Sequence, residues 1–85
     1  MRVHVGSVLH RYTGTAQVEA EGSTVAAVMT DLDRRFPGLR FRVIDEHDHI
    51  RPHMKIFVAC DCVMSIAAPV PAGVEIHILG ALSGG

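Results

Sequence analysis

Apolar and polar side chains alternate along the first part of the chain. Residues 1–9 carry this alternation, which predicts a strand with one buried face. A second alternating segment covers residues 16–21, after turn-forming residues at 11–14. Because only a short turn separates the two segments, they are expected to pair as a β-hairpin.

The apolar spacing becomes helical after Thr24. Five apolar residues recur at intervals of three or four positions and form one stripe: Val25, Val28, Met29, Leu32 and Phe36. Gly22-Ser23-Thr24 supplies an N-cap in front of this stripe, and Pro37-Gly38 ends the helix behind it. The sequence therefore predicts one amphipathic helix.

The second half of the chain returns to strand patterns. Residues 41–44 predict a short strand, residues 45–48 a polar turn and residues 54–58 a strand rich in β-formers. The last predicted strand, residues 74–79, is so apolar that a central position in the sheet, parallel to the first strand, is expected. One helix can cover only one face of a sheet, so the predicted fold class is α+β.

Composition narrows the class of protein. The chain has 85 residues, 48% of them hydrophobic and 20% charged, which fits one globular domain over residues 1–85. Its net charge of −1 shows no excess of basic residues of the kind that nucleic-acid binding requires. No apolar run approaches the about 18 residues that predict a membrane span, and no signal-peptide pattern opens the chain. We expect a cytoplasmic protein with reduced cysteines.

The sequence closes with Gly84-Gly85, soon after the last predicted strand. Glycine makes up about 7% of ordinary sequences, so this pair at the final positions is uncommon. Two residues without a Cβ can lie extended in a channel too narrow for side chains. The reactive group would be the α-carboxylate of Gly85, which needs a partner that activates it. The alternative is a frayed end without a chemical role.

Several segments carry a resemblance to a known family, in this order along the chain: Phe36-Pro37-Gly38-Leu39-Arg40, Val43-Ile44-Asp45-Glu46, Ile50-Arg51, Ile56-Phe57-Val58 and Ile78-Leu79-Gly80-Ala81-Leu82-Ser83-Gly84-Gly85. With a helix on a mixed sheet and a central final strand, they resemble the β-grasp sulfur carriers of the MoaD/ThiS family. The spacing is most similar to the longer members, which include MoaD-like and cysteine-biosynthesis carriers. Ala59-Cys60-Asp61-Cys62 and Ala72-Gly73-Val74-Glu75 depart from the family pattern, so the downstream pathway stays open.

The resemblance implies a β-grasp (ubiquitin-like) fold with a mixed sheet of four to five strands, one helix on one face and a flexible tail over about residues 80–85. In this family an E1-like adenylating enzyme uses ATP to adenylate the terminal glycine, and sulfur from a donor then replaces AMP. By position, Gly85 would carry the resulting thiocarboxylate, and Leu82, Ser83 and Gly84 would lie in the partner's channel. A downstream synthase would use the sulfur for molybdopterin, thiazole, cysteine or a similar product.

The chain itself is expected to be a protein substrate and not an enzyme. It contains no glycine-rich phosphate-binding motif, and no intrinsic cofactor is expected. Two other function classes stay open. A ubiquitin-like modifier would join Gly85 to lysine through an isopeptide bond, and an interaction module would use the diglycine without covalent chemistry.

A docking patch is predicted on the sheet face away from the helix. If Ile56 and Val58 face the helix, alternation places Phe57 on the other face, where no second helix is predicted to cover it. Cys62 and Leu79 join Phe57 by the same alternation. The alternative is an ordinary sheet-surface residue.

Two clusters invite a metal interpretation, and we expect no metal at either. Cys60 and Cys62 supply only half of a tetrahedral zinc site, which His53 or His77 could complete without any spacing that requires it. We interpret both cysteines as small hydrophobic residues. His47, His49 and His53 lie in and after the polar turn and are interpreted as a solvated loop.

Overall fold

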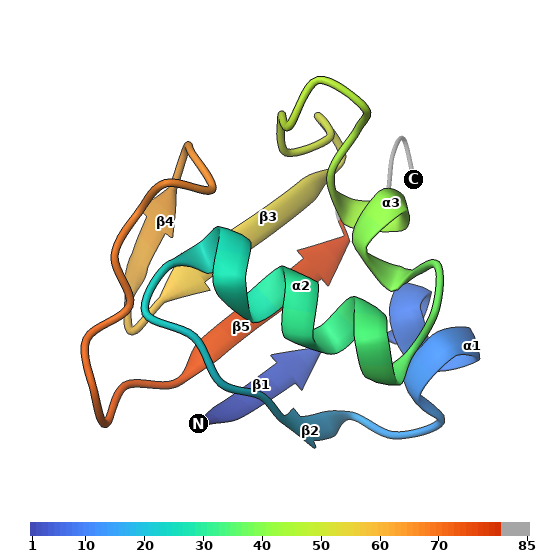
Figure 1. The fold of residues 1–85 in the computed structure, drawn as a ribbon. Coiled ribbons are helices and arrows are strands. Elements are labelled where there is room, and N and C mark those ends of the chain that lie inside the picture. Colours follow the sequence, from blue (N-terminus) through green and yellow to red (C-terminus); the bar gives the residue numbers. More distant parts are fainter. Residues whose placement is uncertain (81–85) are drawn as a thin grey trace.

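The computed structural model describes residues 1–80 as a mixed five-stranded sheet with helices packed on one face (Figure 1). The elements in chain order are β1 (Arg2–Val5), the 3₁₀ turn η1 (Ser7–Leu9), α1 (His10–Thr13), β2 (Gln17–Glu19), α2 (Val25–Arg35), α3 (Leu39–Val43), β3 (Met54–Val58), β4 (Asp61–Val63) and β5 (Ile76–Gly80). The strand order across the sheet is β2-β1-β5-β3-β4. The predicted α+β class is confirmed.

β5 lies in the centre of the sheet. It pairs in parallel with β1 and antiparallel with β3, so both of its edges are hydrogen-bonded. Ile76 and Ile78 point into the core and are fully buried. The predicted central position and parallel pairing are confirmed, although the strand covers 76–80 instead of 74–79.

The long helix α2 forms as its apolar stripe predicts. The Thr24 hydroxyl accepts a hydrogen bond from the Ala27 backbone N–H at 3.1 Å, which caps the first turn. Four of the five stripe residues are buried in the core: Val25, Val28, Met29 and Leu32. The helix packs these residues against one face of the sheet, and this packing provides most of its stability.

The first predicted strand is too long. β1 ends at Val5, and residues 7–13 form η1 and α1 instead. The Gly6 N–H still donates to the Ile78 carbonyl at 2.8 Å, but the Leu9 N–H donates back to the Gly6 carbonyl and turns the chain. Leu9 is fully buried, so burial of this side chain favours the turn over a longer strand. The β1–β2 hairpin is confirmed, with this helical segment as its connection.

The strand predicted at 41–44 is wrong, because residues 41–43 belong to α3 and Ile44 makes only an isolated bridge with Ile50. Gly38 has φ of +95°, a left-handed conformation that suits glycine and starts the new helix. The Asp33 carboxylate accepts the Gly38 and Arg40 N–H groups at 3.1 Å each. Leu39 and Val43, four positions apart, are fully buried on one side of the helix.

The strand predicted at residues 54–58 is confirmed as β3. The fifth strand of the sheet is β4, which the sequence analysis did not predict. The polar turn at 45–48 is confirmed, because the Asp45 carboxylate accepts the N–H groups of His47 and His49 at 2.8 and 3.0 Å. No helix within residues 1–80 has the length and apolar character needed to cross a membrane.

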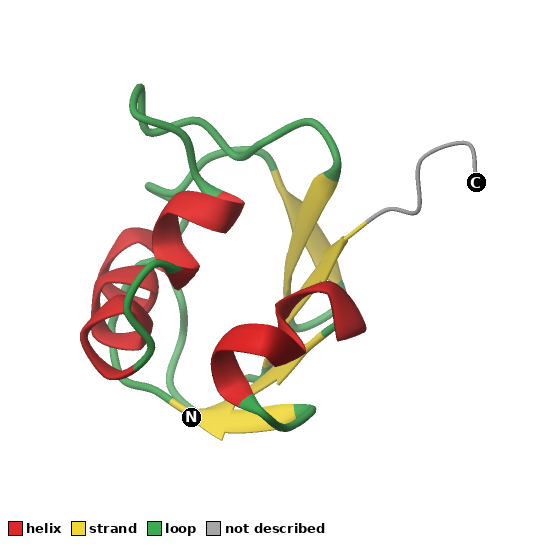
Figure 2. Ribbon diagram, turned by 90° about the vertical axis from the view of Figure 1, so that its right-hand side faces the viewer, coloured by secondary structure: helices red, strands yellow, loops and turns green. Residues whose placement is uncertain are grey.

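The helices leave one face of the sheet open. In Figure 2, α2 and α3 lie on one side of the strands, while η1 and α1 lie at the end where β1 and β5 finish. The sheet face opposite α2, here called the outer face, carries no helix among the described residues.

The close approach of η1 to β5 gives a stability prediction for Gly80→Ala. A Cβ at Gly80 would lie 2.6 Å from Val8 Cγ2, so the methyl group would push η1 away from the end of β5. We expect the free energy of unfolding to fall by about 1–3 kcal/mol, measured by urea denaturation.

Gly6→Ala is the matched control. A Cβ at Gly6 would be 3.5 Å from its nearest neighbour, and its φ of −69° suits any L-residue, so little change is expected. The Gly80→Ala, Val8→Ala double variant removes the Val8 methyl groups that a Cβ at residue 80 would meet, so it should recover part of the lost free energy of unfolding. A Gly80→Ala protein as stable as the unmodified chain would contradict the close packing.

Asp31 gives a pH-dependent stability prediction. Its side chain is buried, accepts the Glu21 N–H at 3.0 Å and pairs with Arg34 and Arg35 of the same helix. The Glu21 hydrogen bond, helped by the two guanidinium groups, holds the pKa of Asp31 below its ordinary value. The folded pKa therefore lies below the unfolded one. The resulting stabilisation is complete above the unfolded pKa and is lost as the pH falls through the folded pKa.

We expect Asp31→Asn to lower the free energy of unfolding at pH 7, by an amount that shrinks toward pH 3. Urea denaturation at both pH values measures this difference. Asp61→Asn, which changes an exposed carboxylate, serves as the control. An equal loss for Asp31→Asn at both pH values would show that shape, and not charge, accounts for the effect.

Candidate functional site

One row of residues crosses the outer face and takes one side chain from each strand. The register pairs His4 of β1 with His77 of β5, and His77 with Phe57 of β3. The row extends to Gln17 on β2 and Cys62 on β4. Because successive strand residues point to opposite faces, these side chains all lie away from the core. This row is the centre of the candidate site.

The predicted docking patch lies on this face. Phe57 is half-buried and directly opposite Cys62 in the β3–β4 pair. Leu79, two residues beyond His77, is diagonal to Phe57 and 40% exposed. The structure therefore brings Phe57, Cys62 and Leu79 to one uncovered face, and their role in docking stays a prediction.

The tail predictions lie outside the described residues. Leu82, Ser83, Gly84 and Gly85 belong to residues 81–85, and the described part of β5 ends at Gly80. Gly80 is opposite Met54, at the end of the sheet where β1 and β5 finish. The residues predicted to carry the chemistry therefore follow directly from the central strand.

A cluster that the sequence analysis did not predict occupies the middle of the outer face. The rings of His4 and His77 stack with centroids 4.3 Å apart and planes 9° from parallel. His4 Nε2 is 2.5 Å from Glu75 Oε1, and the Arg2 guanidinium is 3.7 Å from Glu75 Oε2. The hydrogen bond with His4, together with the charges of His4 and Arg2, holds the pKa of Glu75 below its ordinary value.

Among the described residues, neither the two cysteines nor the histidines near the polar turn belong to a group of three converging metal-ligating side chains. Cys60 and Cys62 are free and exposed. His47 and His49 are exposed in the polar turn, and Arg42 lies 3.3 Å from His53 Nε2. Among residues 1–80, the metal-ligating side chains that converge in a group of three are His4, Glu75 and His77.

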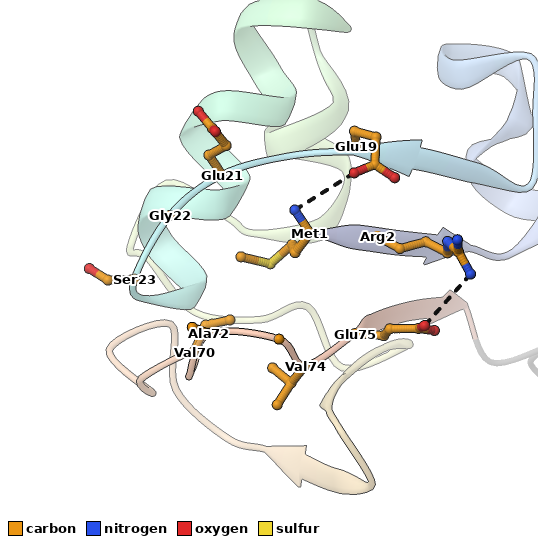
Figure 3. Close-up of a pocket in the computed structure, with 11 residues that line it drawn as sticks. Met1, Arg2, Glu19, Glu21, Gly22, Ser23, Val70, Ala72, Val74 and Glu75 are labelled. Atoms are coloured by element: carbon orange, nitrogen blue, oxygen red, sulfur yellow. Dashed lines mark ion pairs between the residues drawn. The ribbon is translucent and has the colours of Figure 1, made fainter.

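A cleft of about 670 Å³ opens at the other end of the sheet from Gly80 (Figure 3). Its lining comes from the start of β1, the end of β2 and the loops before α2 and β5: Met1, Arg2, Glu19, Glu21, Gly22, Ser23, Val70, Ala72, Gly73, Val74 and Glu75. Two ion pairs cross its rim, Met1–Glu19 and Arg2–Glu75, both at 3.7 Å. Because β1 and β5 are parallel, this cleft is remote from the end of β5 that leads to the diglycine.

A smaller hollow of about 120 Å³ lies nearer that end of β5. Met54 and Lys55 of β3 and Cys62 of β4 line it, together with residues 50–52. Since Met54 and Lys55 pair with Gly80 and Leu79, the hollow borders both the docking patch and the start of the tail.

Comparison with known proteins finds similar solved structures but no similar sequence family. No protein-family model matches the chain, and no curated protein matches it in sequence. Among solved structures, a chain of the Amycolatopsis orientalis BexX/CysO complex has a TM-score of 0.90 and 28% identity, over 99% of this chain and 98% of that one. Mycobacterium tuberculosis CysO, described as an antigen, has a TM-score of 0.88 and 26% identity, over 95% and 98% of the two chains.

The small archaeal modifier protein 1 (SAMP1) of Methanosarcina acetivorans also matches. Its TM-score is 0.81 over 99% of this chain and 94% of that one, with 20% identity, so it supports the fold alone. The predicted β-grasp fold is confirmed by these neighbours. The first two neighbours also support the MoaD/ThiS resemblance, at the coarse level of the β-grasp fold family.

Proposed function

We propose that this protein is a sulfur carrier whose Gly85 accepts and delivers sulfur as a C-terminal thiocarboxylate. The observation that carries the proposal is a β-grasp body whose central strand, β5, leads within five residues to Gly84-Gly85. The two CysO-containing neighbours share this fold and align over nearly their whole length, which supports a carrier body of the same size.

The chemistry begins with a carboxylate that does not react by itself. An E1-like adenylating enzyme transfers AMP from ATP to the Gly85 carboxylate and releases pyrophosphate. Hydrosulfide supplied by a donor then attacks the acyl carbon, AMP leaves with the electron pair of the broken C–O bond, and the new thioacid loses its proton. The product is a thiocarboxylate. In this scheme the chain is a cosubstrate, because the adenylating enzyme supplies the nucleotide site that the sequence lacks.

The outer face is the proposed contact with the activating enzyme. Phe57 of β3, Cys62 of β4 and Leu79 of β5 form an uncovered patch, and β5 is the strand that leads to residue 81. An aromatic residue with apolar neighbours on such a surface has the composition of an interface centre. Docking there would hold the body while Leu82, Ser83 and Gly84 lie in the partner's channel and present Gly85.

A downstream synthase is the proposed consumer of the sulfur, with molybdopterin, thiazole, cysteine or a similar compound as its product. The BexX/CysO complex supports a protein partner in general, because a neighbour of this fold is seen together with a second protein. The alternative function is a ubiquitin-like modifier joined to lysine through the same Gly85. It is favoured by the fold shared with SAMP1, which is named a modifier.

The thiocarboxylate gives a direct prediction. Protein isolated from cells that contain its native partners should gain about 16 Da, because one terminal oxygen is replaced by sulfur. Intact-mass spectrometry followed by fragmentation should assign the change to Gly85. Conjugates of this chain with other proteins would instead favour the modifier.

Deleting Gly85 is the control for both covalent functions. The truncated chain keeps every described residue and should fold normally, but it should neither gain the mass nor form conjugates. Sulfur transfer that persists in the truncated chain would contradict the proposal.

The docking patch gives a second prediction. Phe57→Ala should weaken binding to the activating enzyme by about tenfold or more, because a central aromatic contact is lost. Phe41→Ala is the matched control, since Phe41 is 56% exposed on α3, on the covered side of the sheet. Affinity can be measured by calorimetry and folding by circular dichroism. If Phe57→Ala perturbs folding, Leu79→Ala tests the same surface. Unchanged affinity in a folded patch variant would remove the patch from the interface.

A further inference from the structure

Three ligand-type side chains converge on the outer face, from β1 and from the start of β5. His4 and His77 are direct register partners in the parallel β1–β5 pair, so their rings are brought face to face. Glu75 lies two residues before His77 and therefore projects to the same side. One ligand atom from each of the three residues lies within 4.8 Å of the other two.

The backbone holds these residues in place. β1 lies between β2 and β5, and β5 lies between β1 and β3, so neither strand is an edge. The Glu75 carbonyl accepts the Ala59 N–H at 2.9 Å, which fixes the residue just before β5 begins. A ligand that binds here needs to order only side-chain rotations, and its entropic cost is correspondingly small.

The donor set matches a transition-metal ion. Two imidazoles and one carboxylate are ligands found in zinc sites, at bond lengths of about 2.0–2.2 Å. Ligand atoms around a tetrahedral ion are then about 3.3 Å apart, which rotation of these half-exposed side chains can reach. Imidazole favours zinc, copper or nickel over magnesium and calcium, which prefer oxygen ligands.

The two oxygens of Glu75 have separate partners. Oε1 faces His4 and is available to an ion, while Oε2 pairs with Arg2 at 3.7 Å. The Arg2 guanidinium thereby orients the Glu75 carboxylate. Residues that contact a metal ligand without touching the metal commonly have this role. Figure 3 shows this Arg2–Glu75 pair beside the cleft.

We propose that His4, Glu75 and His77 form a binding site on the outer face for one divalent transition-metal ion such as Zn²⁺. The ion replaces the His4–Glu75 hydrogen bond and takes one nitrogen from each imidazole and Oε1 from the carboxylate. A fourth position stays open toward solvent, because the outer face carries no helix among the described residues. This inference does not depend on the sulfur-carrier proposal and differs from the sequence-based expectation of no metal.

The test uses the full chain, stripped of metal with a chelator and titrated with Zn²⁺ by calorimetry. We expect one equivalent to bind. His4→Ala and His77→Ala should each weaken binding by about tenfold or more, and Glu75→Gln should weaken it as well. The matched control is His49→Ala, which removes an exposed histidine from the polar turn.

The two exposed cysteines are the competing ligands. The Cys60→Ser, Cys62→Ser double variant should keep its full zinc affinity, and the Co²⁺ complex of the unmodified chain should show no thiolate charge-transfer band. Circular dichroism should confirm that each histidine variant is folded; if one is not, Glu75→Gln carries the test. Zinc binding that survives loss of His4 and His77, that disappears with the cysteines, or that is absent from the unmodified chain would overturn the proposal.

Discussion

The hydrogen-bonded ladder that holds β5 between β1 and β3 is the constraint on which the rest of the molecule depends. A strand paired on both edges has its position and register fixed, so its alternating side chains are divided between two environments. Ile76 and Ile78 enter the core under α2, whereas His77 and Leu79 are placed on the outer face. The same ladder sets the place where the chain leaves the sheet at Gly80, and η1 packs against that end through Val8.

The two faces of the sheet differ: the face under the helices forms the core, and the outer face stays available for recognition by a partner. α2 and α3 cover one face and, with the fully buried Leu9 of η1, form a continuous apolar core. The outer face keeps a half-buried aromatic, Phe57, and an exposed leucine, Leu79. A face that folding does not need to cover can be used for a partner. This division suits the proposed carrier function, because a partner could recognise the sheet without disturbing the segment proposed to carry the reactive group.

The outer face also combines two kinds of chemistry in one cross-strand row. Phe57 contributes apolar area, and His77 beside it belongs to the imidazole–carboxylate cluster with His4 and Glu75. The cleft shown in Figure 3 begins on the other side of the Arg2–Glu75 pair, so Glu75 belongs to both features. A change at Glu75 therefore acts on the metal ligands and on the rim of the cleft together.

The sequence alone determined the features that depend on local periodicity. The helical spacing after Thr24, the alternation in β3 and the apolar character of β5 predicted the helix, the central strand and the face on which Phe57 lies. The sequence pattern gave the wrong element at residues 41–44, because four residues fit either a strand or a helical turn. The burial of Leu39 and Val43 on one side of a helix favours the helix. The sequence pattern also could not place His4 beside His77. That contact joins residues 73 positions apart, and only the tertiary structure decided it, because the register of a parallel pair is set by long-range hydrogen bonds and shared core packing.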